Sequence, residues 1–476
     1  MSYSYLKRAF SINRGALYIN KIDFHRDDIL IPAAPAQHRF WILHQIENAN
    51  SAYTEINFRY MRGELNANAF GVAYNRFICR HNSLRTNIAL ENGQLVQKVR
   101  KIKACSNAIE MINLAQFDEP YRSAEVKRIL LHEANYSFDL ASDPLIRLTI
   151  IQLESDLHII AAVAHHIIFD GWSWGIFWNE MQQLYNAELK GIELNLPDLK
   201  YHYSDFAISQ HRWLEGENKK RLSDFWRGEL SDIPHSFDLP FMRKRYVRQS
   251  FDQKEIGTII SQDCIAKVRA ICGKKQTSPF IFFLSIFNLL LWKYTNAGDI
   301  VIGILSSGRD RKELRNLIGH FITTLPIRTK IDVHASFAEF LNKTGECVIN
   351  AIEHQNLPFE EIVNELNVKR DQSIHPIFQV MFSYYNMPTS KGGFIGLQEE
   401  QYPFDKPIHS QYDLTLKMNA NLSKTVAWIE YNRELFESNS MVRMIGHFIS
   451  LIDNVINDIL DFRIFKMLGQ LATFPC

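Results

Sequence analysis

The sequence predicts an α/β protein made of two related halves. The chain has 476 residues, 46% of them hydrophobic and 22% charged, which is the composition of an ordinary globular protein with room for roughly two to three domains. Apolar residues recur with helical spacing in some segments and form strand-like runs in others. The two kinds of segment alternate in a similar order on either side of the middle, which indicates two lobes of related fold.

Helices and strands alternate through the first half. The spacing predicts helices at Gln37–Glu47, Asn66–Arg80 and Arg122–Asn135, and strands at Tyr53–Arg62, Leu84–Leu90, Leu95–Arg100, Leu145–Leu153 and Leu157–Val163. A further helix begins after Gly171 and runs through Leu184, with Ser173 expected as its N-cap.

The second half follows a polar, aromatic segment, Tyr203–Leu230, which we expect to be helical and to connect the halves. Helices are expected at Cys264–Gly273, Pro279–Tyr294, Ser336–Glu353 and Ser438–Ile456, and strands at Gln249–Ile256, Ile300–Leu305, Thr324–Lys330, Phe378–Tyr385, Tyr412–Met418 and Thr425–Tyr431. The apolar run Phe280–Trp292 is too short to span a membrane, so it predicts a buried core helix.

Charge and cysteine content exclude several classes of protein. The chain has 53 Lys and Arg against 52 Asp and Glu, a net charge of +1, so it has no basic field to attract nucleic acid. Its six cysteines are dispersed without a C-x-x-C pair, which argues against a metal site and fits the reducing cytoplasm. The N-terminus carries no apolar secretory signal.

One segment concentrates residues that can do chemistry. His165 and His166 end an apolar strand, and Asp170 and Gly171 precede the next helix. Successive strand residues point to opposite faces, so one histidine is expected to be structural and the other free to act. An imidazole can take or relay a proton near neutral pH.

Asp170 and Gly171 have separate expected roles. A buried carboxylate requires a cation, and Arg80, Arg85 and Arg309 are the alternatives for Asp170. Gly171 permits a sharp turn and could present its N–H group to a reacting carbonyl.

Seven segments resemble, in order, the motifs of the condensation domains of nonribosomal peptide synthetases, relatives of chloramphenicol acetyltransferase. They are A-Q-H-R-F-W-I-L from Ala36, R-H-N-S-L-R-T from Arg80, H-H-I-I-F-D-G from His165, Y-S-D-F-A from Tyr203, I-G-H-F-I-T-T-L-P-I-R from Ile318, H-Q-N-L-P-F-E from His354, and Arg370-Asp371 followed by P-I-F-Q-V-M-F from Pro376. The resemblance covers about residues 30 to 460.

The resemblance implies two acetyltransferase-like lobes in a V-shaped pseudo-dimer with a tunnel between them. The corresponding domains are an extension over 1–24, an N-terminal lobe over 25–205, a connection over 206–235, a C-terminal lobe over 236–460 and the start of a linker over 461–476.

The reaction implied is amide-bond formation between a donor thioester and the amine of an acceptor aminoacyl thioester. Both substrates hang from the phosphopantetheine arms of carrier proteins, one upstream and one downstream, and the domain itself binds no cofactor. His166 is the implied catalytic residue and Gly171 a candidate oxyanion donor. His165, Asp170, Arg80, Arg85 and Arg309 are expected to be structural, and the substrate-channel candidates are Trp172, Ser173, His320, Thr323 and Gln379.

Two residues depart from the family pattern. Thr323 stands where the family has Asn, and His320 where it favours an aromatic or apolar residue. Threonine keeps a hydroxyl but lacks the paired donor and acceptor of an amide. The acceptor preference is therefore expected to be unusual.

Other acyltransferase classes remain alternatives. An epimerization domain would carry E-G-H-G-R in its second half, and a heterocyclizing relative would replace the histidines with aspartates; this sequence has neither feature. A stand-alone acyltransferase using CoA or a carrier protein and a noncatalytic recruitment domain stay open. The tail from Phe462 resembles the start of a linker to an adenylation domain, and the initial Met favours an N-terminal position, with the donor arriving on a separate polypeptide or as a fatty acyl starter. We expect a cytoplasmic monomer that contacts neither nucleic acid nor membrane.

Overall fold

The structure is a computed structural model that describes residues 28–45, 53–101, 109–234, 236–246, 252–368, 371, 373–385, 392–400, 408–409, 412–419 and 424–457. The expected extension over 1–24, the linker over 461–476 and Arg370 lie outside these residues, as do two of the cysteines, Cys105 and Cys476. The other four cysteines are free thiols.

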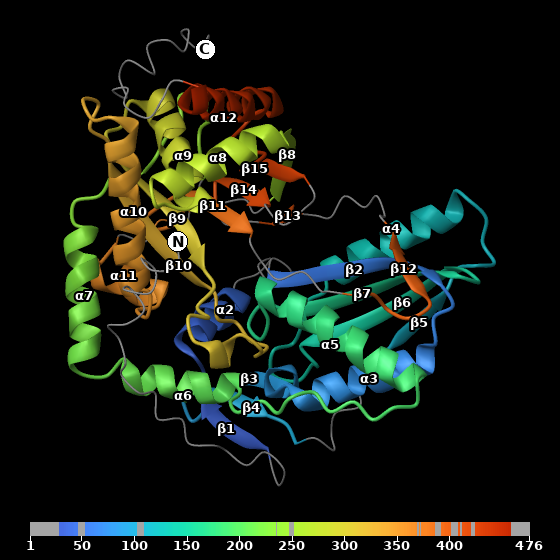
Figure 1. The fold of residues 1–476 in the computed structure, drawn as a ribbon. Coiled ribbons are helices and arrows are strands. Elements are labelled where there is room, and N and C mark those ends of the chain that lie inside the picture. The colour runs from blue at the N-terminus through green and yellow to red at the C-terminus, as the bar shows by residue number, and fades with distance from the viewer. Residues whose placement is uncertain are drawn as a thin grey trace.

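The first half is built on a five-stranded sheet (Figure 1). Its order is β12 (Leu397–Glu400), β2 (Thr54–Gly63), β7 (Leu157–His165), β6 (Ile146–Glu154) and β5 (Glu110–Asn113), antiparallel except for the parallel pair β5–β6. Every residue of β7 is buried, because helices cover both faces of the sheet.

Side chains of β2 alternate between the two faces. Glu55 and Asn57 point to α5 (Gly171–Leu189), where they accept hydrogen bonds from Trp174 and Trp178. Thr54 points the other way, to the carbonyl of Tyr136 just after α4 (Tyr121–Ala134). α3 (Ala67–Arg80) packs beside α5.

A small antiparallel sheet stands apart from the five-stranded one. It joins β1 (Ile29–Pro32), β4 (Gln94–Val99) and β3 (Thr86–Glu91). A 3-10 turn over Asn82–Arg85 leads into β3, and α2 (Pro35–His44) follows β1 and lies between the two halves (Figure 1).

The second half contains a seven-stranded mixed sheet. Its order is β10 (Thr323–Lys330), β9 (Asp299–Ser306), β11 (Val380–Tyr385), β14 (Leu414–Asn419), β15 (Thr425–Asn432), β8 (Asp252–Ile260) and β13 (Ile408–His409). The helices that pack on it are α9 (Pro279–Thr295), α10 (Phe337–Glu353), α11 (Phe359–Glu365) and α12 (Ser438–Asn457), and α8 (Gln262–Lys274) packs against α9 and α12.

β12 crosses between the halves. It comes late in the chain yet pairs with β2, so that Leu397 opposes Gly63 and Glu400 opposes Tyr60. Phe394, just before it, is buried in the core of the first half. Figure 1 shows this orange strand beside the blue β2, so residues 392–400 pack with the first half although the sequence led us to expect one C-terminal lobe over 236–460.

Two predicted helix boundaries were wrong. The N-cap of α5 is Asp170, whose side chain accepts a hydrogen bond from the Ser173 N–H; Ser173 itself lies in the first turn. The predicted connecting helix is two helices, α6 (Tyr203–Trp213) and α7 (Glu217–Glu229). Leu214 caps the C-terminus of α6, and Gly216 is the N-cap of α7. The φ of Gly216 is +64°, a conformation that glycine adopts without strain and that lets the chain turn between the two helices.

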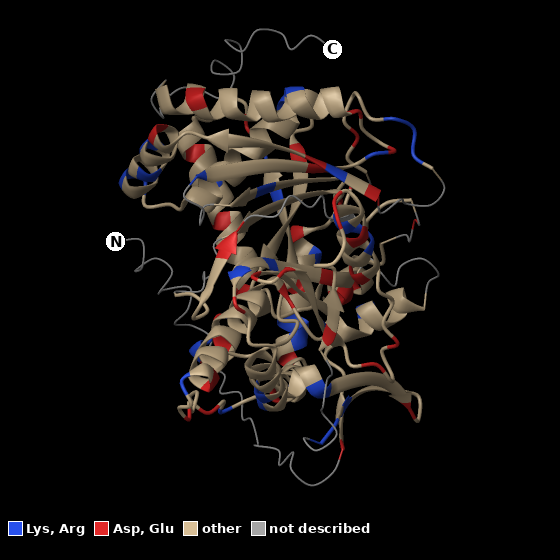
Figure 2. Ribbon diagram, turned by 90° about the vertical axis from the view of Figure 1, so that its right-hand side faces the viewer, with Lys and Arg blue, Asp and Glu red and all other residues tan. Residues whose placement is uncertain are grey.

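The apolar segment Phe280–Trp292 lies in α9, buried in the core of the second half as predicted. Within the described residues no single helix is long and apolar enough to cross a membrane, although α8 and α9, bent at 105° to each other, pass that test as a pair. Figure 2 shows acidic and basic positions interspersed over both halves on the side it presents.

Candidate active site between the two halves

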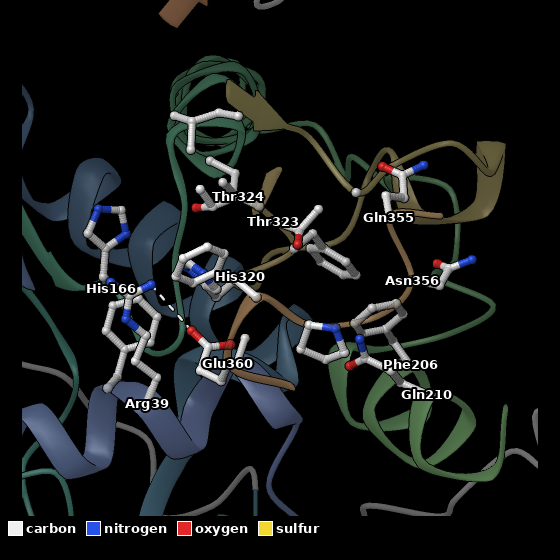
Figure 3. A pocket seen from close by; sticks show the side chains of 18 of the residues that line it. Arg39, His166, Phe206, Gln210, His320, Thr323, Thr324, Gln355, Asn356 and Glu360 are labelled. Carbon is white, nitrogen blue, oxygen red and sulfur yellow. Dashed lines mark hydrogen bonds and ion pairs between the residues drawn. The ribbon is translucent and has the colours of Figure 1, made fainter. Parts of the chain in front are cut away.

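A cavity of about 300 Å³ lies where the two halves meet. Phe40, Tyr53 and His166 line it from the first half. Phe206 of α6 and the segment from His320 to Thr324 line it from the connection and the second half. Figure 3 shows His166 on one side of this space and Gln355 and Asn356 on the other.

His166 follows directly on the end of β7. Its N–H donates to the carbonyl of Tyr53 at 2.8 Å, and its Nδ1 lies 3.0 Å from the carbonyl oxygen of Phe169. The ring stacks on Phe40 at 6.0 Å and meets the edge of His320 at 5.7 Å, and 24% of the side chain is exposed. The ring is therefore held in place and still reaches the cavity, as the sequence predicted for the active histidine.

The pKa of His166 lies above its ordinary value. Burial acts to lower this pKa, but the nearby carboxylate of Glu55, the Phe169 carbonyl and Asp170 together outweigh burial. Glu55 Oε1 lies 3.0 Å from His166 Nε2, and Glu55 Oε2 accepts from Trp174 Nε1 at 2.9 Å. Glu55 was not among the site residues predicted from the sequence.

His165 is the structural member of the pair. Its residue is 1% exposed, and its Nδ1 accepts a hydrogen bond from the Ile167 N–H at 3.0 Å. Burial and the neighbouring histidines hold the pKa of His165 well below its usual value, so its ring is neutral near pH 7. The two rings thus have different surroundings, although β7 ends at His165 and His166 lies in the turn after it.

Asp170 pairs with Arg309 of the second half. Arg309 Nη2 lies 2.9 Å from both carboxylate oxygens, and both side chains are fully buried. The carboxylate also accepts from the N–H and hydroxyl of Ser173 and from the N–H of Phe321. Of the three arginines that the sequence left open, the structure therefore selects Arg309.

Arg80 and Arg85 bind elsewhere. Arg80 forms an ion pair with Glu180 at 3.2 Å and donates to the carbonyl of Pro197. Arg85 donates to the Asn82 side chain and to the carbonyl of Arg100. Both arginines brace the first half and neither contacts Asp170, because α3 and the turn after it carry them to other partners.

The predicted channel residues divide into two groups. His320 and Thr323 line the cavity. Trp172, Ser173 and Gln379 do not, so these three predictions were wrong for the cavity that the structure shows. Trp172 donates to the carbonyl of Arg315, and Ser173 is buried against Asp170.

Gln379 and His320 have distinct surroundings. Gln379 is buried with its amide bonded to the backbone of Phe237 and His375, which removes it from the cavity. Burial, with the adjacent His166, lowers the pKa of His320 to about 4. His320 is therefore a neutral polar ring at one wall of the cavity, at one of the two positions where this sequence departs from the family pattern.

Gly171 is the first residue of α5, where backbone N–H groups have no partner within the helix. It is not among the residues that line the cavity. Its role as an oxyanion donor stays a prediction.

Gln37 gives the first motif a function beyond helix packing. Its Nε2 donates to the carbonyl of Ile167 at 3.0 Å and its Oε1 accepts from the Ala34 N–H. Gln37 thus fastens α2 to the segment that carries His166. Two residues along, Arg39 forms an ion pair with Glu360 across the halves at 3.3 Å, drawn as the dashed line in Figure 3.

Over the described part of the chain, no group of three or more His, Cys, Asp or Glu side chains is arranged to hold a metal ion. Both carboxylates near His166 are engaged by protein partners instead: Asp170 by Arg309, and Glu55 by His166 and Trp174.

The fold and this site define a class of protein. The model of the condensation domain family matches residues 29–463, and the chain therefore belongs to the condensation domains of nonribosomal peptide synthetases. Relatives include linear gramicidin synthase subunits D and B from Brevibacillus parabrevis, 31% and 33% identical over 90% of this chain. Malpinin synthetase from Mortierella alpina is 30% identical over 88% of it. The chain spans only 8%, 8% and 5% of these three proteins.

Solved structures share the fold. The X-domain from teicoplanin biosynthesis superposes with a TM-score of 0.81 at 22% identity, covering 94% of this chain and 98% of that one. A four-domain nonribosomal peptide synthetase bound to AMP and glycine gives 0.81 at 19% identity, covering 94% of this chain and 34% of that one. At these identities the likeness establishes the α/β architecture.

Proposed function

We propose that this chain catalyses amide-bond formation between a donor acyl or peptidyl thioester and the amine of an acceptor aminoacyl thioester. The observation that supports this best is the position of His166. Its ring reaches a cavity walled by both halves, and its Nδ1 is fixed by the Phe169 carbonyl. A carbonyl can only accept, so Nδ1 carries a hydrogen and the neutral ring has its lone pair on Nε2.

In the proposed reaction the acceptor amine attacks the thioester carbonyl and forms the C–N bond. The C–S bond then breaks, and the proton that leaves the nitrogen passes through His166 Nε2 to the departing thiolate. An α-amine has a pKa of about 7.7–8.0, so part of it is nucleophilic without help. Holding the two tethered reactants together therefore contributes more than proton transfer, which typically gives about 10²–10⁴-fold.

The backbone N–H of Gly171 is our candidate for the group that stabilises the tetrahedral oxyanion. Its place at the N-terminus of α5 supports this role, since the free N–H groups and the helix dipole both favour negative charge there.

The substrates of this reaction are carried by other proteins. We propose an upstream donor carrier protein and a downstream acceptor carrier protein, each presenting a phosphopantetheine arm, and an adjacent adenylation domain. The domain division given above, with its lobes over 25–205 and 236–460, belongs to the same proposal except for residues 392–400, which pack with the first half. A V-shaped arrangement with a tunnel is part of it as well. Free cysteines are consistent with a cytoplasmic monomer, which is the state we propose.

The test is a condensation assay followed by intact-protein mass spectrometry. Donor and acceptor groups are loaded on separate carrier proteins, and product is followed with the wild-type chain and with His166→Ala. We expect the variant to lose about 10²–10⁴-fold in rate. His132→Ala, which removes an exposed histidine of α4, is the matched control and should retain the wild-type rate.

Two further arms separate the alternatives. Turnover of free CoA thioesters in place of the loaded donor carrier would support a stand-alone acyltransferase. Absence of product with every loaded pair, from a protein that melts cooperatively, would favour a recruitment domain. Full activity of His166→Ala would overturn the catalytic role of His166.

A further inference from the structure

Glu55 meets the one nitrogen of His166 that the reaction needs. Nδ1 is committed to the Phe169 carbonyl, and Nε2 lies 3.0 Å from Glu55 Oε1. A lone pair on Nε2 would repel the lone pairs of a carboxylate at this distance. The two atoms must therefore have a proton between them.

Main-chain hydrogen bonds hold Glu55 next to His166. Glu55 opposes Ala164 in the β2–β7 register, and the His166 N–H bonds to the carbonyl of Tyr53, two residues before Glu55 on the same chain segment. The strand that carries Glu55 is thus fixed to the turn that carries His166 by main-chain bonds.

A second hydrogen bond between β2 and α5 is a purely structural contact with which the bond to Glu55 can be compared. Trp178 Nε1 donates to Asn57 Oδ1 at 2.8 Å, two residues along β2 and one turn along α5 from the bond between Trp174 and Glu55. The neutral amide of Asn57 accepts from Trp178 at 2.8 Å, as short as the 2.9 Å bond from Trp174 to the Glu55 carboxylate. The charge of Glu55 is therefore not required for packing, and its second oxygen serves His166.

Other ionisable groups around the ring are neutral or committed. The pKa values of His165 and His320 are both lowered by burial, so these rings are neutral. Asp170 is paired with Arg309, and Arg39, which also lines the cavity, is paired with Glu360. Among the described neighbours, Glu55 is the group whose charge acts directly on Nε2.

We propose that Glu55 is a positioning residue for His166, holding its Nε2 edge and sharing one proton with it between turnovers. This inference rests on the proposed condensation reaction. The shared proton leaves to water through the Glu55 carboxylate, which is 27% exposed, and frees Nε2. Nε2 then takes the proton of the attacking amine and returns it to the leaving thiolate, so the amine N–H becomes the thiol S–H and no other reactant is consumed.

The direction of the effect on pH follows from the contact. A carboxylate beside an imidazole favours the protonated ring, so removing its charge lowers the pKa of His166. Glu55→Gln retains an oxygen that can accept from Trp174 while it loses the charge. The variant should therefore shift the pH midpoint of condensation downward. Its rate at pH 7 should fall about tenfold, less than in His166→Ala, because a weaker base remains in place.

The first measurement is the pH profile of single-turnover condensation for wild type and Glu55→Gln with the same acceptor. The titration of the amine is common to both curves, so a displacement between them belongs to the enzyme. Glu55→Asp, which keeps the charge, should move the midpoint less than Glu55→Gln. Asn57→Ala removes the parallel bond to Trp178 and should leave the midpoint unchanged.

A second measurement does not depend on catalysis. In protein labelled with ¹³C-histidine, the ring signal of His166 is assigned by its loss in His166→Ala and titrated in wild type and Glu55→Gln. We expect a lower midpoint in the variant. An unchanged midpoint would overturn the proposal for Glu55 whether or not condensation is observed, whereas failed condensation with a shifted midpoint would count against the proposed function alone.

Discussion

Asp170 and Arg309 lie 139 positions apart in the chain and form a completely buried ion pair, with one guanidinium nitrogen 2.9 Å from both carboxylate oxygens. Asp170 caps α5 in the first half, and Arg309 lies after β9 in the second. Arg309 also donates to the carbonyls of Leu314 and Leu317, so the pair fixes the loop that leads to His320. One contact thereby aligns two walls of the cavity.

Removing either partner should destabilise the protein strongly. Asp170→Ala or Arg309→Ala leaves an unpaired buried charge, and we expect the free energy of unfolding to fall by about 3–5 kcal/mol. The double variant should lose less than the sum of the two. Urea unfolding measures these values, with Asp224→Ala, which removes an exposed partner of Arg227, as the control for a surface pair. Asp170→Ala with wild-type stability would contradict this account.

The junction of β2 and β12 should depend on Gly63. Its φ is +127°, and a Cβ there would overlap the carbonyl oxygen of Gly396. Gly63→Ala should therefore separate β12 from β2, and hydrogen exchange should show faster exchange of amides over 397–400. Gly93, at φ +79° in the turn between β3 and β4, has no described heavy atom within 4 Å of the position that an added Cβ would take. Gly93→Ala should cost only the backbone strain of about 1–2 kcal/mol and leave β12 protected.

Acid should destabilise the protein through His375. Burial, assisted by the charge of Arg39, lowers the pKa of this ring to about 3, among Phe359, Phe378 and Tyr412. Below pH ~6.5 the imidazole is protonated in the unfolded chain but stays neutral in the folded protein. The contribution of His375 to the free energy of unfolding is therefore fully present above pH ~6.5 and is lost as the pH falls toward 3. The loss is about 2 kcal/mol at pH 5.

His375→Phe removes this group and keeps an aromatic ring in the same pocket. The difference in unfolding free energy between pH 7.5 and pH 5 should shrink by that amount relative to wild type. His334→Phe, at an exposed position, should retain the full acid-induced loss. Equal pH dependence in wild type and His375→Phe would rule out this role for His375.

Thr323 should influence which acceptor is used. It begins β10 opposite Ser306 and lines the cavity, where the family has an asparagine. Thr323→Asn adds an amide donor and acceptor, and one such hydrogen bond changes relative rates by about two- to tenfold. Competition between two loaded acceptors, with one donor, measures the ratio. Thr258→Asn on β8, away from the cavity, is the control. An unchanged ratio of the two products in Thr323→Asn would show that this position does not affect which acceptor is used.

Local patterns predicted most helices and strands. α3 follows from helical apolar spacing, and β7 follows from a continuous apolar run. Strand alternation predicted only that one of the two histidines is free, and the resemblance to the family motif pointed to His166. β12 was missed because Leu397-Gln398-Glu399-Glu400 is polar and short, and its partner strand is more than 330 positions earlier. Its register is fixed by contacts with β2, including the ion pair Arg62–Glu400 at 2.7 Å, which no local window contains.

The site was likewise predictable only where its residues are close together in the sequence. The segment from His165 to Gly171 is distinctive in the sequence, but nothing near Glu55 in the sequence says that it faces His166. A usable signal did exist. Glu55 and Asn57 share one face of β2, and Trp174 and Trp178 share one face of α5, so the two polar residues and the two indole donors have matching spacing. Only the sheet register shows that they meet.

Because β12 belongs to the second half by sequence and to the first by hydrogen bonding, the two halves are not interchangeable modules. A chimaera joined between α6 and α7 would bring a foreign edge strand to β2, together with its own partners for Arg59 and Arg62. Recombination that aims to alter substrate choice should therefore transfer residues 392–400 with the half they adjoin in space. Splitting the polypeptide at Gly216 would, for the same reason, leave two fragments still held together by shared main-chain pairing.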